Sequence, residues 1–348
     1  MFGIFNKVDK RSVGIDIGES SIKLVDIVRD NDKLVLNNYT ELQLGKYVGK
    51  EAGDIVKLGH EDLRRAMSDL YEISKSECRN ITVGIPMSAC QFKLITFSQK
   101  VKPFLNDLVE LEFRKYTLLP VSELSISFNI LKEDENNLHV LVVAIKNKEI
   151  ERINYATNFI KKDNYKLEPS MFGLVRNIVD QNHDMSMVVD FGASSTSVLY
   201  IVDSVIYGAD TFSKGVNEIV VNIKTGLSLD YVTAHNKFFQ LDIMESSKME
   251  SDIASRTMHH ICEEVIHIQN NFSRKFDVKC STLYISGGGS KINNILKFLE
   301  QEFKDLKVIK INSFDRLYIP ETIKDLAVKN SPTYNNAIGL ALSEIINF

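Results

Sequence analysis

Two short segments of this sequence carry residue types that bind phosphate groups. Residues 13–25 read VGIDIGESSIKLV, and residues 188–200 read VVDFGASSTSVLY. In each, an apolar strand runs into an aspartate, then a glycine, then a pair of serines. Glycine lets the chain turn closely past a ligand, backbone N–H groups and hydroxyls bind phosphate oxygens, and the carboxylate can stand beside a metal ion. Each segment therefore suits a polyphosphate with a divalent cation.

The distance between the two segments makes this interpretation stronger. One Asp-x-Gly turn alone is more often a plain hairpin than a ligand site. Here the matching residues are all separated by 174 positions, half of the 348-residue chain: Asp16 and Asp190, Gly18 and Gly192, Ser20 and Ser194, and Ser21 and Ser195. The repeat predicts two similar lobes that face one polyphosphate.

The composition excludes several classes of protein. The chain is 44% hydrophobic and 25% charged, which is ordinary for a globular protein of about two domains. Its net charge of −4 gives no general attraction to nucleic acid or anionic lipid. The four cysteines form no close pair, which fits a reducing cytoplasm. No stretch approaches the roughly 20 apolar residues that span a membrane. We expect a soluble cytoplasmic protein.

The alternation of strands and helices predicts an α/β protein with two lobes. Lobe one would cover residues 1–182, with a core at about 1–85 and a small inserted α/β subdomain at about 86–167. A polar stretch, 45–59, reads as a loop. Lobe two would cover 183–348, with an inserted helical and strand subdomain at about 204–270. A closing helix at 335–346 would pack back toward lobe one, and its Gly339 would allow close packing.

A third chemical signal is LYISGGGSKI at residues 283–292. A buried strand that runs into three glycines and a helix can place bare backbone against a flat or anionic ligand. Such turns serve simple packing about as often. The spacing matches neither a Walker loop nor a dinucleotide-binding fingerprint.

The order of these features resembles the actin superfamily of nucleotide-binding folds. Within it, the chain is most similar to the PilM family, actin-like cytoplasmic proteins of type IV pilus assembly. The similarity covers nearly the whole chain. It rests on the opening MFGIFNK, both Asp-Gly segments, LVELEFRKYTLLPVSELSISFNIL, VLVVAIKNKEIERINYATNFIKK, GVNEIVVNIKTGLSLDYVTAHNKF, LYISGGGSKINNILKFLEQEF and NNAIGLALSE.

This resemblance implies two duplicated ribonuclease H-like domains around ATP or ADP. Asp16 and Asp190 would hold Mg²⁺ through water. Lys23 would offset phosphate charge, although a solvent-facing strand lysine is the alternative. The phosphates would be lined by the loop residues Gly18, Ser20, Ser21, Gly192, Ser194, Ser195 and Thr196.

The resemblance also implies a base and ribose site in lobe two. Asn217 and Glu218, after Gly215, would contact the ribose or base, and Gly287, Gly288, Gly289 and Lys291 would form the base side of the cleft. The family usually has a second glycine where this chain has Val216, whose side chain would crowd the nucleotide. No residue that positions an attacking water can be named from spacing, so we expect slow or no hydrolysis.

The family resemblance implies a nucleotide-binding scaffold in the inner-membrane assembly platform. Lobe one and its insertion would bind the cytoplasmic N-terminal tail of PilN as an extended peptide. Other platform proteins, the assembly ATPase and further copies of the chain are additional expected partners. Membrane contact would be indirect, because the chain ends at Phe348 without the membrane-binding helix usual in FtsA-like division proteins.

Two other interpretations remain open. The first is an actin-fold phosphotransferase such as a small-molecule kinase, which the fold permits but no acceptor-site motif favours. The second is an FtsA-like division filament. A metal site at His260, Glu264 and His267 has suitable helical spacing, but these residues are more often solvated side chains.

Overall fold

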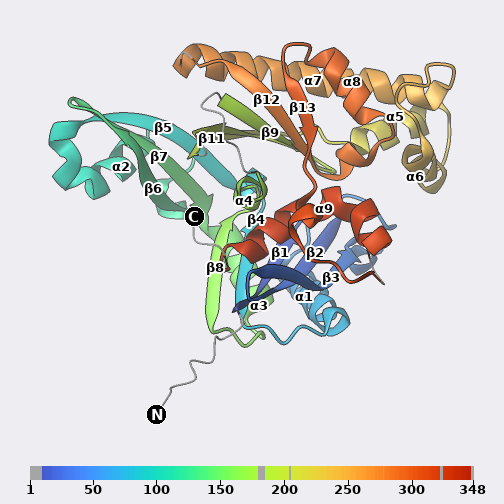
Figure 1. Ribbon diagram of the computed structural model, residues 1–348, viewed down its shortest axis with the longest axis horizontal. Coiled ribbons are helices and arrows are strands. Elements are labelled where there is room, and N and C mark those ends of the chain that lie inside the picture. Colours follow the sequence, from blue (N-terminus) through green and yellow to red (C-terminus); the bar gives the residue numbers. More distant parts are fainter. Residues whose placement is uncertain (1–9, 179–184, 204, 277, 322–323, 346–348) are drawn as a thin grey trace.

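The computed structural model describes residues 10–178, 185–203, 205–276, 278–321 and 324–345 (Figure 1). The expected boundary between the lobes at 182 and 183, the expected start of an insertion at 204, and the last residue of the predicted closing helix, 346, lie outside these ranges.

The first sheet has five strands in the order β3-β2-β1-β4-β8. Its first three strands form the antiparallel meander expected from the sequence, and β4 and β8 extend it by parallel pairing. The strands are β1 (Lys10–Ile17), β2 (Ser21–Asp30), β3 (Lys33–Gln43), β4 (Asn80–Ile85) and β8 (Asn164–Pro169).

The second sheet repeats this topology. Its order is β11-β10-β9-β12-β13, again with three antiparallel strands followed by two parallel ones. The strands are β9 (Met185–Phe191), β10 (Thr196–Val202), β11 (Val205–Phe212), β12 (Cys280–Ser286) and β13 (Lys307–Lys310). The duplication seen in two short segments therefore extends to the order and direction of all five strands.

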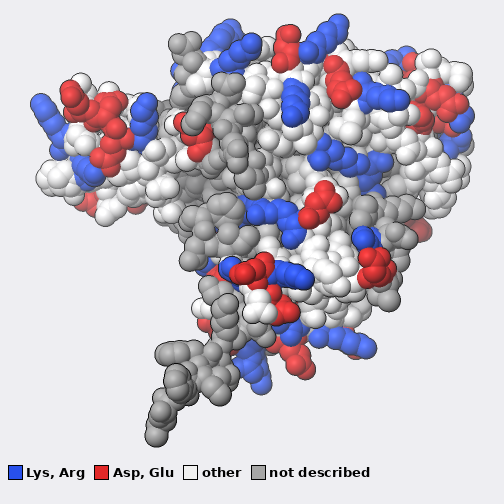
Figure 2. All heavy atoms as spheres, viewed as in Figure 1, with Lys and Arg blue, Asp and Glu red and all other residues white. Residues whose placement is uncertain are grey.

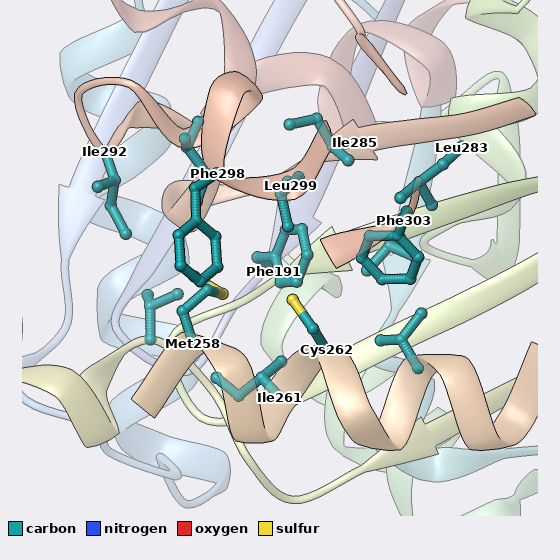
Figure 3. Close-up of a cluster of buried hydrophobic side chains, with 14 of the residues drawn as sticks. Phe191, Met258, Ile261, Cys262, Leu283, Ile285, Ile292, Phe298, Leu299 and Phe303 are labelled. Atoms are coloured by element: carbon teal, nitrogen blue, oxygen red, sulfur yellow. The ribbon is translucent and has the colours of Figure 1, made fainter. Parts of the chain in front are cut away.

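Helices cover the outer face of each sheet. On the first sheet these are α1 (His60–Ser74) and α3 (Asn147–Thr157), which share one apolar cluster with the strands. In the second lobe they are α5 (Asn217–Gly226), α6 (Tyr231–Gln240), α7 (Met249–Phe276) and α8 (Ile295–Glu302). Figure 3 shows α7 directing Met258, Ile261 and Cys262 at the side chains of β12 and α8.

Two helices lie between the sheets, and each packs on the sheet of the other lobe. The helix α4 (Phe172–Asn177) follows β8 of the first sheet, but its Leu174 packs on the second sheet. The helix α9 (Lys324–Leu342) follows the second sheet, but it packs on β1, β2 and β4 of the first. In Figure 1 it crosses the middle of the molecule.

Glycines allow the close approach of these helices. A Cβ on Gly339 would collide with the backbone of Gly173 in α4, and a Cβ on Gly173 would lie 2.7 Å from the carbonyl oxygen of Asn336. A Cβ on Gly14 of β1 would collide with the backbone of α9 at Ala337. The backbones are therefore in direct contact at both places.

The inserted unit of the first lobe is shorter than the sequence suggested. Its separate sheet has the order β5-β7-β6, and α2 (Leu105–Phe113) covers one face. The strands are β5 (Cys90–Ser98), β6 (Leu124–Glu133) and β7 (Asn137–Lys146). The following α3 and β8 belong to the first-lobe core, because α3 packs on α1 and β8 pairs with β4. We therefore place the end of the insertion at about 146 instead of 167.

The expected insertion of the second lobe also needs correction. The strand β11 pairs along its length with β10, so it is an edge strand of the core sheet. The helix α7 buries Ala254, Met258, Ile261 and Val265 in that core. β11 and α7 therefore belong to the core of the second lobe.

Short 3₁₀ helices complete the described elements, and one of them lies in the polar stretch that was expected to be a loop. They are η1 (Gly45–Val48), η2 (Met87–Ala89), η3 (Gln99–Phe104), η4 (Val121–Glu123), η5 (Gly288–Lys291) and η6 (Ser313–Arg316).

The substitution Gly339→Ala tests the helix contact. Its methyl group would meet the backbone of Gly173, so α4 and α9 must separate, and we expect the free energy of unfolding to fall by about 2 kcal/mol. Gly208→Ala is the matched control, because its Cβ would make only ordinary contacts at 3.7 Å with Phe272 and Tyr200. Equilibrium urea unfolding compares the two, and equal stabilities would contradict the described packing.

Candidate functional site

The two Asp-Gly segments form hairpins with the same hydrogen bond. The N–H of Gly18 donates to the carbonyl oxygen of Ser21 at 3.1 Å, and the N–H of Gly192 donates to that of Ser195 at 3.1 Å. A Cβ on either glycine would lie under 3 Å from that same oxygen, at 2.9 Å and 2.8 Å respectively. Both loops therefore require glycine at this position, for the same reason.

The aspartates point into the space between the sheets. Side chains alternate between the faces of a strand, so Asp16 lies on the same face of β1 as Gly14, which contacts α9. By the same alternation Asp190 shares a face of β9 with Val188, which packs toward α4. The carboxylates thus approach one cavity from opposite lobes.

This cavity has a volume of about 500 Å³, within the range of small-molecule sites. Both Asp-Gly hairpins and the glycine-rich turn after β12 line it. Thirteen of the seventeen predicted site residues are on its walls: Asp16, Gly18, Ser20, Ser21, Lys23, Asp190, Gly192, Ser194, Ser195, Asn217, Gly287, Gly288 and Lys291.

Charged residues cross the first sheet in a row. The strand register places Asp16 opposite Lys23 and Lys23 opposite Glu41. The Lys23 ammonium donates to the Ser21 hydroxyl at 2.9 Å and lies 3.8 Å from a Glu41 oxygen. Lys23 is therefore a buried lysine of the cavity and not a solvent-facing one.

The corresponding row in the second sheet has no cation. There the register places Asp190 opposite Ser197 and Ser197 opposite Thr211, and the two hydroxyls lie 3.0 Å apart. The repeated topology thus carries unlike chemistry in its two copies. The row of the first sheet thus brings a lysine, Lys23, to the cavity, and the row of the second sheet has no counterpart to it.

The sequence interpretation missed Asn336, which joins α9 to the site. Its Nδ2 donates to a carboxylate oxygen of Asp190 at 3.0 Å. Its Oδ1 is buried and has no hydrogen-bond partner among the described residues. The neighbouring Asn335 donates to the Ser286 hydroxyl and to the Ile311 carbonyl, both at 3.1 Å. A pair of amides directly before the apolar run at residues 337–342 was the signal available in the sequence.

Burial raises the pKa of both aspartates. It raises the pKa of Asp190 to about 6, the hydrogen bond from Asn336 opposes this rise, and the nearby Asp16 adds to it. Burial also raises the pKa of Asp16, and the Lys23 charge opposes that rise. Carboxylates that resist ionisation without a counter-charge are suited to a cation.

Thr196 and Glu218 lie away from the cavity walls. Thr196 points to the opposite face of β10 from Ser197, and its hydroxyl donates to the Lys214 carbonyl at 2.8 Å. Glu218 lies in a separate surface groove, beside Arg256 and His260.

Gly215 and Gly289 also lie behind the walls, where they permit close packing. A Cβ on Gly215 would collide with the backbone of the second Asp-Gly hairpin at Ala193. A Cβ on Gly289 would lie 2.5 Å from Val216 Cγ1 and 2.7 Å from Phe191 Cβ. Val216 itself lines the cavity, so its side chain occupies space that a bound nucleotide could otherwise use.

The start of α5 is hydrogen-bonded to the second Asp-Gly hairpin. The N–H groups of Val216 and Asn217 donate to the carbonyl oxygens of Gly192 and Ala193, both at 2.9 Å. Two donors of this helix start are thus committed to the loop. They position the loop and are not directed at an anion.

A second group missed by the sequence interpretation is aromatic. His235, Phe238 and Phe239 of α6 line the cavity, with Ala52 and Gly53 from the first lobe beside them. Aromatic residues at helical spacing usually indicate core, which is why they gave no signal for a site.

The donor set fits a divalent cation held through water. Asp16, Glu19, Glu41 and Asp190 give the cavity four carboxylates, against the lysines Lys23 and Lys291. The unpaired Asn336 Oδ1 can accept a hydrogen bond from a cation-bound water. Within the described residues, no group of three or more His, Cys, Asp and Glu side chains is arranged to hold a metal directly. His260, Glu264 and His267 therefore do not form such a group.

The raised pKa of Asp190 predicts a pH dependence of stability. An unfolded aspartate titrates near pH 4 and the folded one at about 6, so the folded protein binds the proton more tightly. As pH rises from about 4 to about 6, ionisation of Asp190 should lower the free energy of unfolding of the wild type relative to Asp190→Asn. Urea unfolding in chelator measures this, and a difference that stays constant with pH would contradict it.

Several solved protein structures are similar to this fold. The structure is similar to the PilM-PilN type IV pilus biogenesis complex, with a TM-score of 0.81 and 16% identity over 97% of this chain and 99% of that chain. It is also similar to MreB 5 of Spiroplasma citri bound to AMPPNP (TM-score 0.52, 12% identity, 88% and 92% covered) and to ethanolamine utilization protein EutJ from Carboxydothermus hydrogenoformans (0.52, 12%, 96% and 89%). These similarities confirm the two-lobe actin-like α/β fold.

No curated protein matches the sequence. Across the described residues, no helix is both long and apolar enough to cross a bilayer. The family model described as type IV pilus assembly protein PilM matches residues 14–345. That match spans nearly the whole chain and includes both Asp-Gly hairpins. The chain belongs to the family of type IV pilus assembly protein PilM.

Proposed function

We propose that this protein binds Mg-ATP or Mg-ADP between its lobes and acts as a nucleotide-dependent scaffold of type IV pilus assembly. The main support for a nucleotide site is a pair of hairpins with the same backbone hydrogen bond on opposite walls of one cavity. Each hairpin follows an inward aspartate. The similar MreB 5 structure is bound to AMPPNP, which supports a nucleotide in this fold.

In this proposal Asp16 and Asp190 hold Mg²⁺ through water, and Lys23 offsets phosphate charge. The carboxylates of the cavity outnumber its lysines, so a bare polyphosphate would be repelled and the cation is needed for binding. The loop hydroxyls of Ser20, Ser21, Ser194 and Ser195 surround the phosphates, and Asn217 lies toward the ribose.

The role that we propose is binding with slow or no hydrolysis. Three of the four cavity carboxylates have an assignment: Asp16 and Asp190 hold the cation, and Glu41 lies beside Lys23, which leaves only Glu19. A bound nucleotide bridging both loops would instead favour one angle between the lobes, as in hinge closure. The family match favours this scaffold over the kinase and the division-filament alternatives.

The proposed partner is the cytoplasmic tail of PilN, on the cytoplasmic side of the inner membrane. The solved complex of PilM with PilN supports this choice. In the insertion, β6 is an outer strand of a three-stranded sheet, so its edge can pair with an extended peptide. Among the described residues on the face shown in Figure 2, positive and negative side chains are intermixed and form no broad basic surface for nucleic acid.

Asp190→Ala tests the nucleotide site. Loss of one of the two carboxylates proposed to hold the cation should weaken Mg-ATP binding by about 10- to 100-fold in calorimetric titration. Glu218→Ala is the control, because the Glu218 carboxylate lies outside the cavity. This variant should bind Mg-ATP as tightly as the wild type. Unchanged affinity in Asp190→Ala would remove the assignment.

Titration of the chain with the N-terminal tail peptide of PilN from the same organism tests the scaffold role. We expect saturable binding, with an affinity that differs between the Mg-ATP-bound and nucleotide-free protein, and no binding of a scrambled peptide. If the tail does not bind while a small phosphate acceptor accelerates ATP turnover, the kinase alternative replaces the scaffold.

A further inference from the structure

A loop of the first lobe contacts α6 of the second lobe beside the cavity. We call residues 44–56, which follow β3, the strap. Both of its ends are hydrogen-bonded to the first Asp-Gly hairpin. The N–H of Leu44 donates to the Ser20 carbonyl oxygen at 2.9 Å, and the N–H of Val56 donates to the Glu19 carbonyl oxygen at 2.8 Å. The strap is therefore attached to that hairpin at two places.

The tip of the strap contacts two side chains of α6. The Tyr231 hydroxyl lies 3.3 Å from the Gly53 carbonyl oxygen, and it donates to Asn217 Oδ1 of its own lobe at 2.8 Å. A Cβ on Gly53 would collide with the His235 imidazole ring, whose Cε1 would be 2.6 Å away. The backbone of the first lobe is therefore in direct contact with a ring of the second.

The His235 ring has little room to move away from the strap. It is stacked on the Tyr231 ring, with centroids 5.7 Å apart and an interplanar angle of 19°, and it meets the Phe239 ring edge to face at 4.6 Å and 82°. Gly53 has a φ of +90°, which other residues rarely adopt. Backbone conformation and lack of space therefore both require glycine at the tip.

An acidic side chain of the strap also acts on α6. Burial raises the pKa of Tyr231 to about 12, and the nearby Asp54 carboxylate adds to this rise. Burial lowers the pKa of His235, and the same carboxylate opposes that change. Asp54 accepts a hydrogen bond from the N–H of Glu51 at 3.0 Å, which closes the turn at the tip. The tyrosine therefore keeps its donor proton at neutral pH.

The strap contact borders the candidate site. Ala52 and Gly53 of the strap and His235 of α6 line the same cavity as both Asp-Gly hairpins. The lobes also meet where α4 and α9 cross, and Asn336 of α9 lines this cavity as well. The cavity is thus bordered by two contacts between the lobes, one made by helices and the other by the tip of a loop.

These two contacts differ in extent. The crossing of α4 and α9 joins helix backbones and lies between two apolar clusters, whereas the strap contact consists of one glycine, one hydroxyl and one imidazole ring. Parts of a structure that are held by few buried contacts open at the lowest cost in free energy. Separation of the lobes should therefore begin at the strap.

We propose that the strap is a gate for nucleotide exchange. Its contact with α6 opens when a nucleotide enters or leaves the cavity, and it closes again afterwards. This inference rests on the proposed nucleotide site and adds the contact that sets the rate of exchange there. Because the strap is attached to the first Asp-Gly hairpin, opening also moves the two hairpins apart.

A gate of this kind changes rates without changing affinity. Every atom of the strap contact belongs to the protein, so the contact forms in both the free and the nucleotide-bound chain. Weakening it makes opening more frequent in both states, so association and release accelerate by the same factor and Kd is unchanged. Loss of a group that binds the nucleotide would instead accelerate release alone and raise Kd.

Gly53→Ala tests the gate. Its methyl group would push the tip of the strap away from His235. We expect a fluorescent ATP analogue with Mg²⁺ to associate and dissociate about tenfold faster than with the wild type, which is the weight of roughly one hydrogen bond with its packing. Kd should stay within about a factor of two. Stopped-flow mixing measures association, and a chase with unlabelled Mg-ATP measures release.

Gly49→Ala is the matched control. Gly49 lies in the same strap and has a φ of +68°, but its Cβ would meet nothing within 4 Å. Both variants place alanine at a positive φ, and only Gly53→Ala adds a collision with α6. The inference is overturned if the two variants release the nucleotide at equal rates. It is also overturned if Gly53→Ala raises Kd in proportion to the release rate, since Gly53 would then act on the ligand.

Hydrogen–deuterium exchange of the nucleotide-free protein distinguishes failure of the gate from failure of the nucleotide site. The strap contact predicts faster exchange at residues 231–239 in Gly53→Ala than in Gly49→Ala, and equal exchange would overturn the contact itself. If the wild type binds no nucleotide, the proposed nucleotide site fails, and the gate fails with it even where the exchange rates differ.

Discussion

The contact between Gly173 and Gly339 sets how the two lobes meet. Each glycine belongs to a helix that has crossed to the sheet of the other lobe, and their backbones touch where α4 and α9 cross. Because protein interiors are close-packed, a side chain at either place would separate the helices and the sheets that they cover. The relative position of the two Asp-Gly hairpins depends on this crossing.

The same helix that makes this contact also reaches the candidate site. One turn before Gly339, Asn336 donates to Asp190, and Asn335 bonds to β12 and to the segment after β13. The helix therefore touches the first sheet with its alanines and the second lobe with its amides. A cation between Asp16 and Asp190 would act directly on this junction, so occupancy of the site and the angle between the lobes are physically linked.

The sequence was sufficient to predict the duplication, the hairpins and most of the cavity, since these follow from local residue types and their spacing. It was insufficient where the outcome depended on which face of an element turned inward. Thr196 looked equivalent to its serine neighbours, but strand alternation directs it away. The α6 rings looked like core, and only packing shows that Phe238 takes that place while Phe239 does not. The short strand β8 was not predicted from the sequence, so its pairing with β4 could not be predicted either.

The most direct test of the central claim is a structure of the protein with Mg²⁺ and a non-hydrolysable ATP analogue. We expect the phosphates between the hairpins at residues 18–21 and 192–195, with the cation between Asp16 and Asp190 and water bridging it to Asn336. A nucleotide bound elsewhere, or one whose phosphates contact only a single hairpin, would contradict it.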